Sequence, residues 1–155
     1  CEEFSSYCLT KENKMLGWGN NKSGQLGIIS PQHTFNPVLI SNNVLKISIG
    51  SAFAAFIDTK NNLYTFGQTF DGRCGVVAQD INIPILIFKG VKSISCGHQH
   101  SIIQTKQFKW MSTGYNADNE CLIQNQEIIP AFTLIEKYQN AIKIEAACWE
   151  TFIWL

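Results

Sequence analysis

The chain has 155 residues, of which 45% are hydrophobic, and its twelve lysine and arginine residues balance twelve aspartate and glutamate residues. This length fits one ordinary domain with enough apolar material for a core, which excludes a globally disordered chain. The net charge of zero argues against a general DNA- or RNA-binding role, because such proteins carry a basic excess, although it leaves a local basic patch open.

The first residues, "CEEFSSYC", lack the basic start and the apolar centre of a signal peptide. No apolar run approaches the roughly 18 residues that cross a bilayer, so we expect no membrane partner. The six cysteines are widely spaced and include no C-x-x-C pair. This spacing favours reduced thiols in an intracellular, cytoplasmic protein over a zinc site or a disulfide framework.

The glycine-rich stretch "GWGNNKSGQLG" at 17–27 could be a phosphate-binding loop or an architectural turn. Lys22 stands where the dinucleotide fingerprint needs its third glycine, and Gln25 stands where a phosphate loop needs its lysine. We therefore expect no nucleotide cofactor. The glycines then serve to turn the chain tightly at the end of a strand.

The same stretch returns twice, as "TFGQTFDGRCG" and, in weaker form, as "STGYNADNECL". Each copy is followed by a proline that opens an apolar run and later by a second matching segment. The landmarks are 17–27, 65–75 and 112–122, then Pro37, Pro84 and Pro130, then 47–57, 94–104 and 144–154. All of them share one period of just under fifty residues, which indicates an internal repeat.

Each repeat predicts short strands. The first copy offers "PVLI" at 37–40, "VLKISIG" at 44–50, and the pair "AAFID" and "LYTFG" around a polar turn at 59–62. The segment 130–148 could form a helix when it is read alone, but its register against the other repeats predicts strand, turn, strand. Four short strands in each period are typical of propeller blades.

Two propeller families are excluded by composition, since the chain has neither the Trp-Asp dipeptide of WD repeats nor the Gly-Gly doublet of kelch repeats. "WGNNKSGQLG" at 18–27 and "CGHQHS" at 96–101 instead resemble the two landmarks of the regulator of chromosome condensation repeat family. The resemblance implies an all-β fold of three consecutive blades of about four antiparallel strands, as part of a propeller of about seven blades.

On this interpretation residues 1–155 are a partial propeller with repeats at about 15–62, 63–109 and 110–155, and residues 1–14 complete a preceding blade. Trp18 and Phe66 are expected to pack between blades, and His100 to be a buried hydrogen-bonding residue. The repeat positions to which we assign structural roles are Trp18, Gly19, Gly24, Gly27, Gly50, Phe66, Gly67, Gly72, Gly75, Gly97, His100 and Gly114. The third repeat departs from the pattern, because Asn119 and Leu122 replace its two later glycines.

Catalytic chemistry has no support in the sequence. Cys96, His98 and His100 could be imagined as metal ligands, but alternate residues of a strand face opposite ways and no fourth ligand is obvious. We therefore expect no enzyme activity, no metal and no cofactor. The loop "QTFDGR" at 68–73 offers an aromatic and an arginine, residue types that favour interfaces. We assign Phe70, Asp71 and Arg73 as candidate partner contacts.

The leading functional interpretation is a non-catalytic protein-interaction or scaffold module within a larger intracellular assembly. The resemblance also implies two alternatives, a guanine-nucleotide exchange factor or other regulator of a small GTPase, and a chromatin-associated adaptor. Eleven lysines against one arginine, with twenty isoleucines and thirteen asparagines, suggest an AT-rich genome. In single-celled eukaryotes with such genomes, propellers of this type occur in cytoskeletal or ciliary assemblies.

Overall fold

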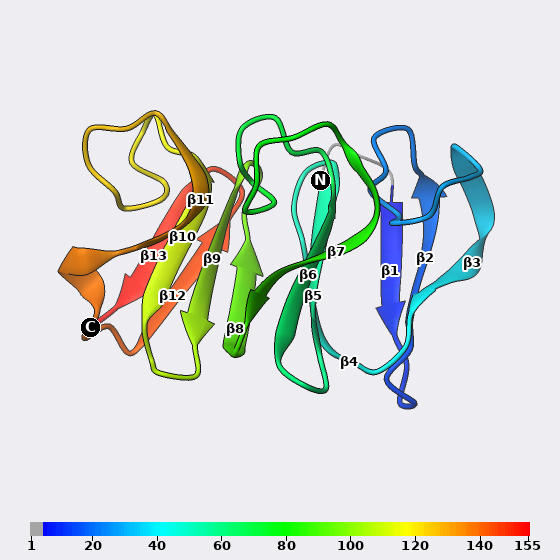
Figure 1. Ribbon diagram of the computed structural model, residues 1–155, viewed down its shortest axis with the longest axis horizontal. Coiled ribbons are helices and arrows are strands. Elements are labelled where there is room, and N and C mark those ends of the chain that lie inside the picture. Colours follow the sequence, from blue (N-terminus) through cyan, green and yellow to red (C-terminus); the bar gives the residue numbers. More distant parts are fainter. Residues whose placement is uncertain (1–4) are drawn as a thin grey trace.

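The computed structural model of the protein describes residues 5–155, whose strands form four antiparallel sheets in chain order (Figure 1). The first sheet holds β1 (Ser5–Leu9), β2 (Met15–Asn20) and β3 (His33–Ser41). The second holds β4 (Val44–Ile49), β5 (Phe53–Asp58), β6 (Asn62–Gly67) and β7 (Ile81–Lys89). The third holds β8 (Val91–Cys96), β9 (His100–Thr105), β10 (Trp110–Tyr115) and β11 (Ile128–Leu134). The last pairs β12 (Lys143–Ala147) with β13 (Glu150–Trp154).

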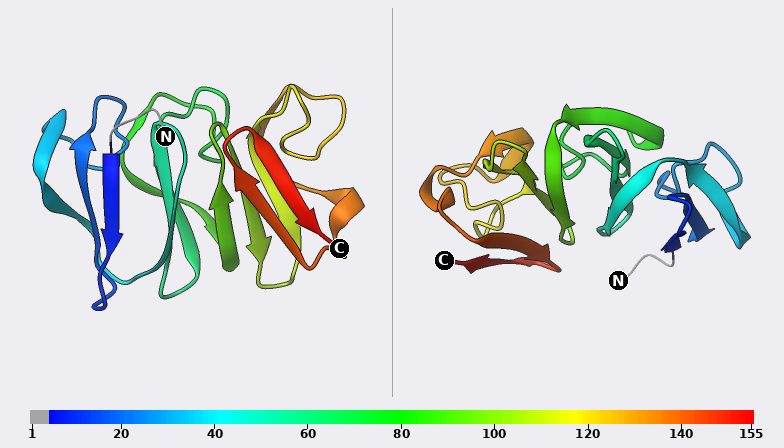
Figure 2. Two further views of the ribbon diagram at one scale, coloured as in Figure 1. Left: turned by 180° about the vertical axis from the view of Figure 1, so that it is seen from behind. Right: turned by 90° about the horizontal axis from the view of Figure 1, so that it is seen from below.

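Each sheet is a meander in which every strand pairs with the next one along the chain. Viewed from below, the sheets fan out in an open arc, as propeller blades do (Figure 2). The all-β propeller fold predicted from the repeats is confirmed. The segment 130–148 is strand, turn, strand as expected, with a single 3-10 turn at η1 (Glu136–Tyr138) between β11 and β12.

The boundaries of the sheets along the chain differ from the boundaries of the sequence repeats. The repeat at 15–62 supplies β2 and β3 to the first sheet and β4 and β5 to the second. We expected residues 1–14 to complete a preceding blade, but Ser5 to Leu9 pair with Met15 to Gly19 in the same sheet; residues 1–4 lie outside the described residues. A repeating pattern fixes the period, and only strand pairing fixes where each sheet begins.

The second strand of each complete sheet is buried on both faces. All six residues of β9 are buried, and so are five of the six in β5, because sheets lie on either side of them. Strands covered on both faces lose the alternation of apolar and polar residues that a one-sided sheet shows. Phe53, Phe56 and Phe66 are at most 1% exposed and form the centre of the larger core.

Hydrogen bonds between first strands hold neighbouring sheets together. The Ser48 Oγ of β4 accepts a bond of 2.9 Å from the Cys96 N–H of β8. At the equivalent place one sheet further on, Ser95 Oγ and the backbone of Ala146 lie 3.0 Å apart. These bonds link β4 to β8 and β8 to β12, so the first strands of successive sheets lie side by side along the arc.

Candidate protein-interaction face

Three long loops lie at one end of the sheets. They join β2 to β3, β6 to β7 and β10 to β11 and cover residues 21–32, 68–80 and 116–127 (Figure 1). We call this end the loop face, and the opposite end, with its shorter connections, the turn face. Loops carried by a rigid sheet are the usual place for binding residues in a propeller.

A side chain at the start of each loop holds the loop closed. Asn21 donates from its amide to the carbonyls of Ile28, at 2.8 Å, and of Pro31, at 3.0 Å. Asn116 makes the same pair of bonds to the carbonyls of Ile123 and Gln126. Thr69 fills this role in the middle loop, where its hydroxyl lies 2.6 Å from the carbonyl of Ala78. The three loops are therefore preorganised rather than loose.

The backbone turns in the same way in all three loops, even where glycine is missing. The two later turn positions have positive φ in every copy: 74°, 82° and 67° at Gly24, Gly72 and Asn119, and 65°, 81° and 59° at Gly27, Gly75 and Leu122. Asparagine tolerates this region, whereas leucine there costs about 1–2 kcal/mol. The third loop therefore keeps the fold of the others at an energetic cost.

The middle loop holds an ion pair that the sequence did not reveal as buried. Asp71 and Arg73 are each 1% exposed and pair with one another, with Arg73 Nε donating to Asp71 Oδ1 at 2.7 Å. The Arg73 guanidinium also donates to the carbonyl of Ser51 at 2.8 Å. The assignment of Asp71 and Arg73 as partner contacts was therefore wrong. The turn folds both side chains inward, where each satisfies the other's charge.

Phe70 is the member of this group that reaches the surface. Its side chain is 56% exposed, and the Arg73 Cζ lies 5.0 Å from the centre of its ring and 5.9 Å from that of Phe53. The buried arginine thus lies against the phenyl ring and holds it in place. The loop presents one ordered aromatic side chain to solvent, supported from below by an ion pair.

Hydroxyl groups tie each loop to the next sheet. The Ser101 Oγ of β9 donates to the carbonyl of Arg73 at 2.7 Å, and the Thr151 Oγ1 of β13 donates to the carbonyl of Glu120 at 2.6 Å. These two carbonyls occupy the same position in successive loops, and the two hydroxyl residues occupy the same position in successive strands. The same contact and the same turns therefore recur in successive blades, as expected for copies of one repeat.

Comparison with known proteins agrees with this geometry. Residues 12–57 match the family model described as the Regulator of chromosome condensation (RCC1) repeat. These residues carry an RCC1 repeat. The chain is similar in sequence to the protein RCC2 homolog of Xenopus laevis, with 28% identity over 151 residues that cover 74% of this chain and 29% of the relative.

Two solved structures share the fold. The crystal structure of Kap60 bound to yeast RCC1 (Prp20) matches with a TM-score of 0.84 and 19% identity, covering 97% of this chain and 40% of that one. The structure of Prp20p from Saccharomyces cerevisiae matches with a TM-score of 0.83 and 18% identity, covering 96% and 41%. The chain therefore spans under half the length of these RCC1 proteins.

The glycines at equivalent positions of the repeats serve two purposes. Gly19, Gly67 and Gly114 have φ of 108°, 103° and 115°, which side chains rarely adopt. Gly97 has no positive φ but lacks space, since a Cβ atom there would lie 2.3 Å from the His100 ring. Gly50 is crowded in the same way by the ring of Phe53.

The two aromatic residues expected between blades differ in their surroundings. Phe66 is fully buried and lies against Gly27 of the preceding sheet, where a Cβ atom would be 3.0 Å from its ring. Trp18 occupies the equivalent position in the first sheet and is only half-buried. By the shared register it faces away from the second sheet, on a side that no sheet covers among residues 5–155.

Cys96 and His100, which were first considered as metal ligands, are buried. His100 is 1% exposed, its Nε2 lies 3.0 Å from Thr151 Oγ1, and burial lowers its pKa to about 4. Burial also raises the pKa of the Cys96 thiol to about 11, and those of Cys74 and Cys121 rise for the same reason. Thiols held protonated are poor nucleophiles and poor metal ligands. Within residues 5–155, no three histidine, cysteine or acidic side chains lie close enough together to hold a metal ion.

A stacked pair of rings, His98 and Trp149, was not predicted from the sequence. The rings of His98 and Trp149 lie 3.9 Å apart between centres, with an angle of 28° between their planes. They belong to the turns that follow β8 and β12, and the His98 N–H donates to the carbonyl of Cys148 at 2.5 Å.

No helix of the described residues has the length and hydropathy that crossing a membrane requires.

Proposed function

We propose that the chain is a non-catalytic protein-interaction module whose partner contacts the loop face at Phe70. The observation that carries this proposal is the ordered, exposed phenyl ring held against Arg73 by a buried ion pair. A preorganised aromatic side chain loses little conformational freedom on binding, which makes it a good interface anchor. The loops around it are closed by their own hydrogen bonds and offer a rigid surface.

The relatives support a role in protein binding. Yeast RCC1 has been crystallised bound to Kap60, and the binding properties of Prp20p to Gsp1p and histones are described with its structure. These partners belong to those proteins. For this chain we infer the same class of activity, contact with other proteins, within an intracellular, cytoplasmic assembly of cytoskeletal or ciliary type.

Comparing partner capture by two surface variants tests the proposal. Phe70→Ser removes the anchor on the loop face, and Phe108→Ser is the matched control, since Phe108 is 62% exposed on the turn face. In extracts of the source cells we expect Phe70→Ser to lose proteins that the unchanged chain and Phe108→Ser both retain. Identical partner sets for all three chains would reject the loop face as the binding surface.

Regulation of a small GTPase is the second candidate, and the binding of Prp20p to Gsp1p favours it. Release of a labelled guanine nucleotide from a panel of purified small GTPases, with and without the chain, is the direct assay. Accelerated release that Phe70→Ser weakens would place this activity on the loop face. No acceleration for any member of the panel would remove the candidate.

Chromatin association is the third candidate, because Prp20p also binds histones. The balanced net charge of the chain offers no general attraction to DNA. Sedimentation with purified nucleosomes at low salt tests it directly, and a chain that stays in the supernatant would exclude the role.

A further inference from the structure

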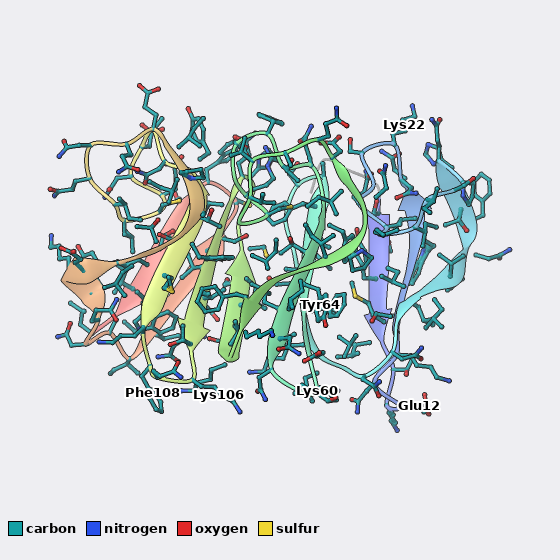
Figure 3. All side chains as sticks on the ribbon, in the orientation of Figure 1. Glu12, Lys22, Lys60, Tyr64, Lys106 and Phe108 are labelled. Carbon is teal, nitrogen blue, oxygen red and sulfur yellow. The ribbon has the colours of Figure 1, made fainter. Side chains whose placement is uncertain are left out.

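The lysines of the chain are gathered at one end of the sheets, although the net charge is zero. Ten of them lie in the connections of the turn face or in the neighbouring parts of its strands, and all ten are exposed. They are Lys11, Lys14, Lys46, Lys60, Lys89, Lys92, Lys106, Lys109, Lys137 and Lys143. Lys22 alone lies on the loop face (Figure 3).

Acidic residues are distributed the other way. The described residues of the turn face include four, namely Glu12, Asp58, Glu136 and Glu145, which leaves that face a net charge of +6. The remaining six described acidic residues belong to the loop face. A surface with one predominant sign of charge attracts partners of the opposite sign and raises their rate of association.

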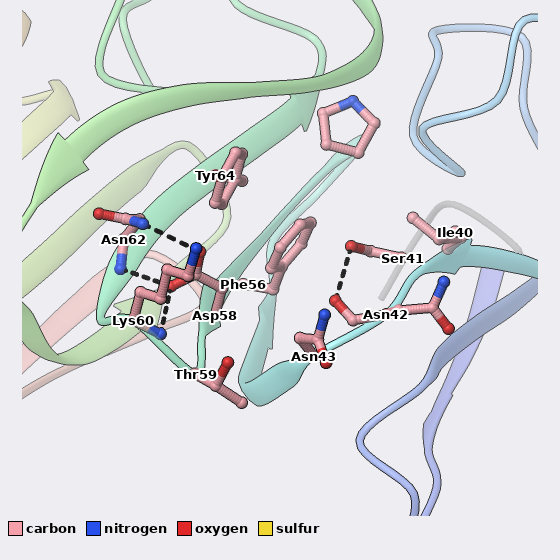
Figure 4. A pocket seen from close by; sticks show the side chains of 11 residues that line it. Ile40, Ser41, Asn42, Asn43, Phe56, Asp58, Thr59, Lys60, Asn62 and Tyr64 are labelled. Carbon is pink, nitrogen blue, oxygen red and sulfur yellow. Dashed lines mark hydrogen bonds between the residues drawn. The ribbon is translucent and has the colours of Figure 1, made fainter.

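A groove opens beside one of these lysines, Lys60, between the first and second sheets (Figure 4). Its volume is about 480 Å³. Phe56 and Tyr64 form its aromatic wall, stacked with 5.0 Å between ring centres and 14° between planes. Asn42 and Lys60 are exposed on its rim. Phe56 is 1% exposed, so the groove offers a limited apolar surface at Tyr64 within a mostly polar lining that carries amides and a positive charge.

The carboxylate of Asp58 also lines the groove, where it offsets part of that positive charge. Its Oδ1 accepts bonds from the backbone N–H groups of Lys60, at 2.9 Å, and Asn62, at 2.8 Å, and its Oδ2 accepts one from the Asn62 amide at 3.0 Å. Asp58 is thus committed to closing its own turn. The polar groups left at the rim are amides, a hydroxyl and an ammonium.

The corresponding space between the second and third sheets is filled. There Phe88 and Phe132 meet edge to face, with 6.2 Å between ring centres. Strand register places Ser41 at the position of Phe88 and Pro84 at the position of Phe132. The groove is open because a serine and a proline stand where the next interface has two phenyl rings. An incoming apolar side chain could occupy the same space.

We propose that the turn face binds an acidic peptide segment of a partner protein, which inserts one apolar side chain into this groove and places its carboxylates against the surrounding lysines. Charge complementarity identifies the partner as acidic, and the amides of the rim suit a peptide backbone. Phosphate polyanions fit less well. Arginine, whose fork binds phosphate through two bonds, is absent from the described turn face. This site lies opposite Phe70 and stands independently of the proposed function.

A labelled synthetic peptide tests the proposal on the 155-residue chain. The probe alternates glutamate and aspartate around one central leucine, and its affinity is measured by fluorescence anisotropy at low salt. Lys60→Glu reverses the charge at the groove, and Lys22→Glu makes the same change on the loop face. We expect Lys60→Glu to weaken binding about tenfold and Lys22→Glu to change it less than about twofold. Equal effects of the two variants would overturn the site.

Two comparisons test the groove itself, one that changes the protein and one that changes the peptide. Ser41→Phe copies the filled interface and should weaken binding of the leucine peptide while leaving a peptide with serine in place of leucine unaffected. The two peptides compared on the unchanged chain give the same information without any risk to folding. Equal affinity for both peptides would overturn the role of the groove. Tighter binding to a DNA duplex or to vesicles of anionic lipid than to the leucine peptide would overturn the assignment of the partner.

Discussion

Replacing Asp71 with alanine should destabilise the fold far more than its position in a surface loop suggests. The change leaves the Arg73 guanidinium buried without its counter-charge and removes the acceptor of three hydrogen bonds, from the backbone N–H, Nε and Nη2 of Arg73. Both residues are 1% exposed, so water cannot replace the carboxylate. Breaking a buried pair from one side costs about 3–5 kcal/mol. This is a large part of the 5–15 kcal/mol that stabilises an ordinary domain.

Urea denaturation gives the measurement, with Phe70→Ala as the matched control. Phe70 is next in sequence and 56% exposed, so its removal forfeits only the contact with the guanidinium, worth about 0.5–1 kcal/mol. Combining Asp71→Ala with Arg73→Met should cost much less than the sum of the two single changes, because neither charge is then left alone. A cost below about 1 kcal/mol for Asp71→Ala, or strictly additive changes, would refute the burial argument.

Three further predictions concern single positions. Gly67→Ala and Gly90→Ala both place a side chain at positive φ, but the new Cβ would lie 2.3 Å from the Ala52 carbonyl oxygen in the first case and near no atom in the second. The first should cost several kcal/mol and the second about 1 kcal/mol in denaturation experiments, and similar costs would contradict the crowding seen here. His100 has a pKa lowered by burial to about 4, so the unfolded chain binds the proton more tightly and stability falls as the pH drops from 6.5 towards 4. His100→Gln should make that loss smaller by about 2–3 kcal/mol, and an unchanged pH profile would show that the imidazole is not held neutral. Phe108 has φ of 61° at an exposed turn where the equivalent residues are asparagines. Phe108→Gly should therefore stabilise the fold by about 0.5–1 kcal/mol, and a lower urea midpoint for this variant would contradict the prediction.

The architecture could be predicted from the sequence alone, because the repeat presents the same pattern of strands and turns several times. The period, the glycines at strand ends and the apolar runs after them predicted short antiparallel strands in propeller blades. The resemblance of residues 18–27 and 96–101 to two family landmarks indicated the RCC1 repeat. Those features are local, since a tight turn favours glycine and a short strand favours apolar and β-branched residues wherever the sheet lies. Even the weak third copy was recognisable, although only the structure shows Asn119 and Leu122 adopting the backbone of the missing glycines.

The candidate site depended on contacts that a repeat pattern does not encode. Asp71 and Arg73 read as surface residues because charged side chains usually are, and their burial follows from a turn that brings them together beneath Phe70. The charged turn face escaped notice for a different reason. The lysines are scattered along the whole chain, and net charge averages them away. Successive strands run in opposite directions, so every second connection returns to the same end, and only the folded meander gathers those lysines onto one surface.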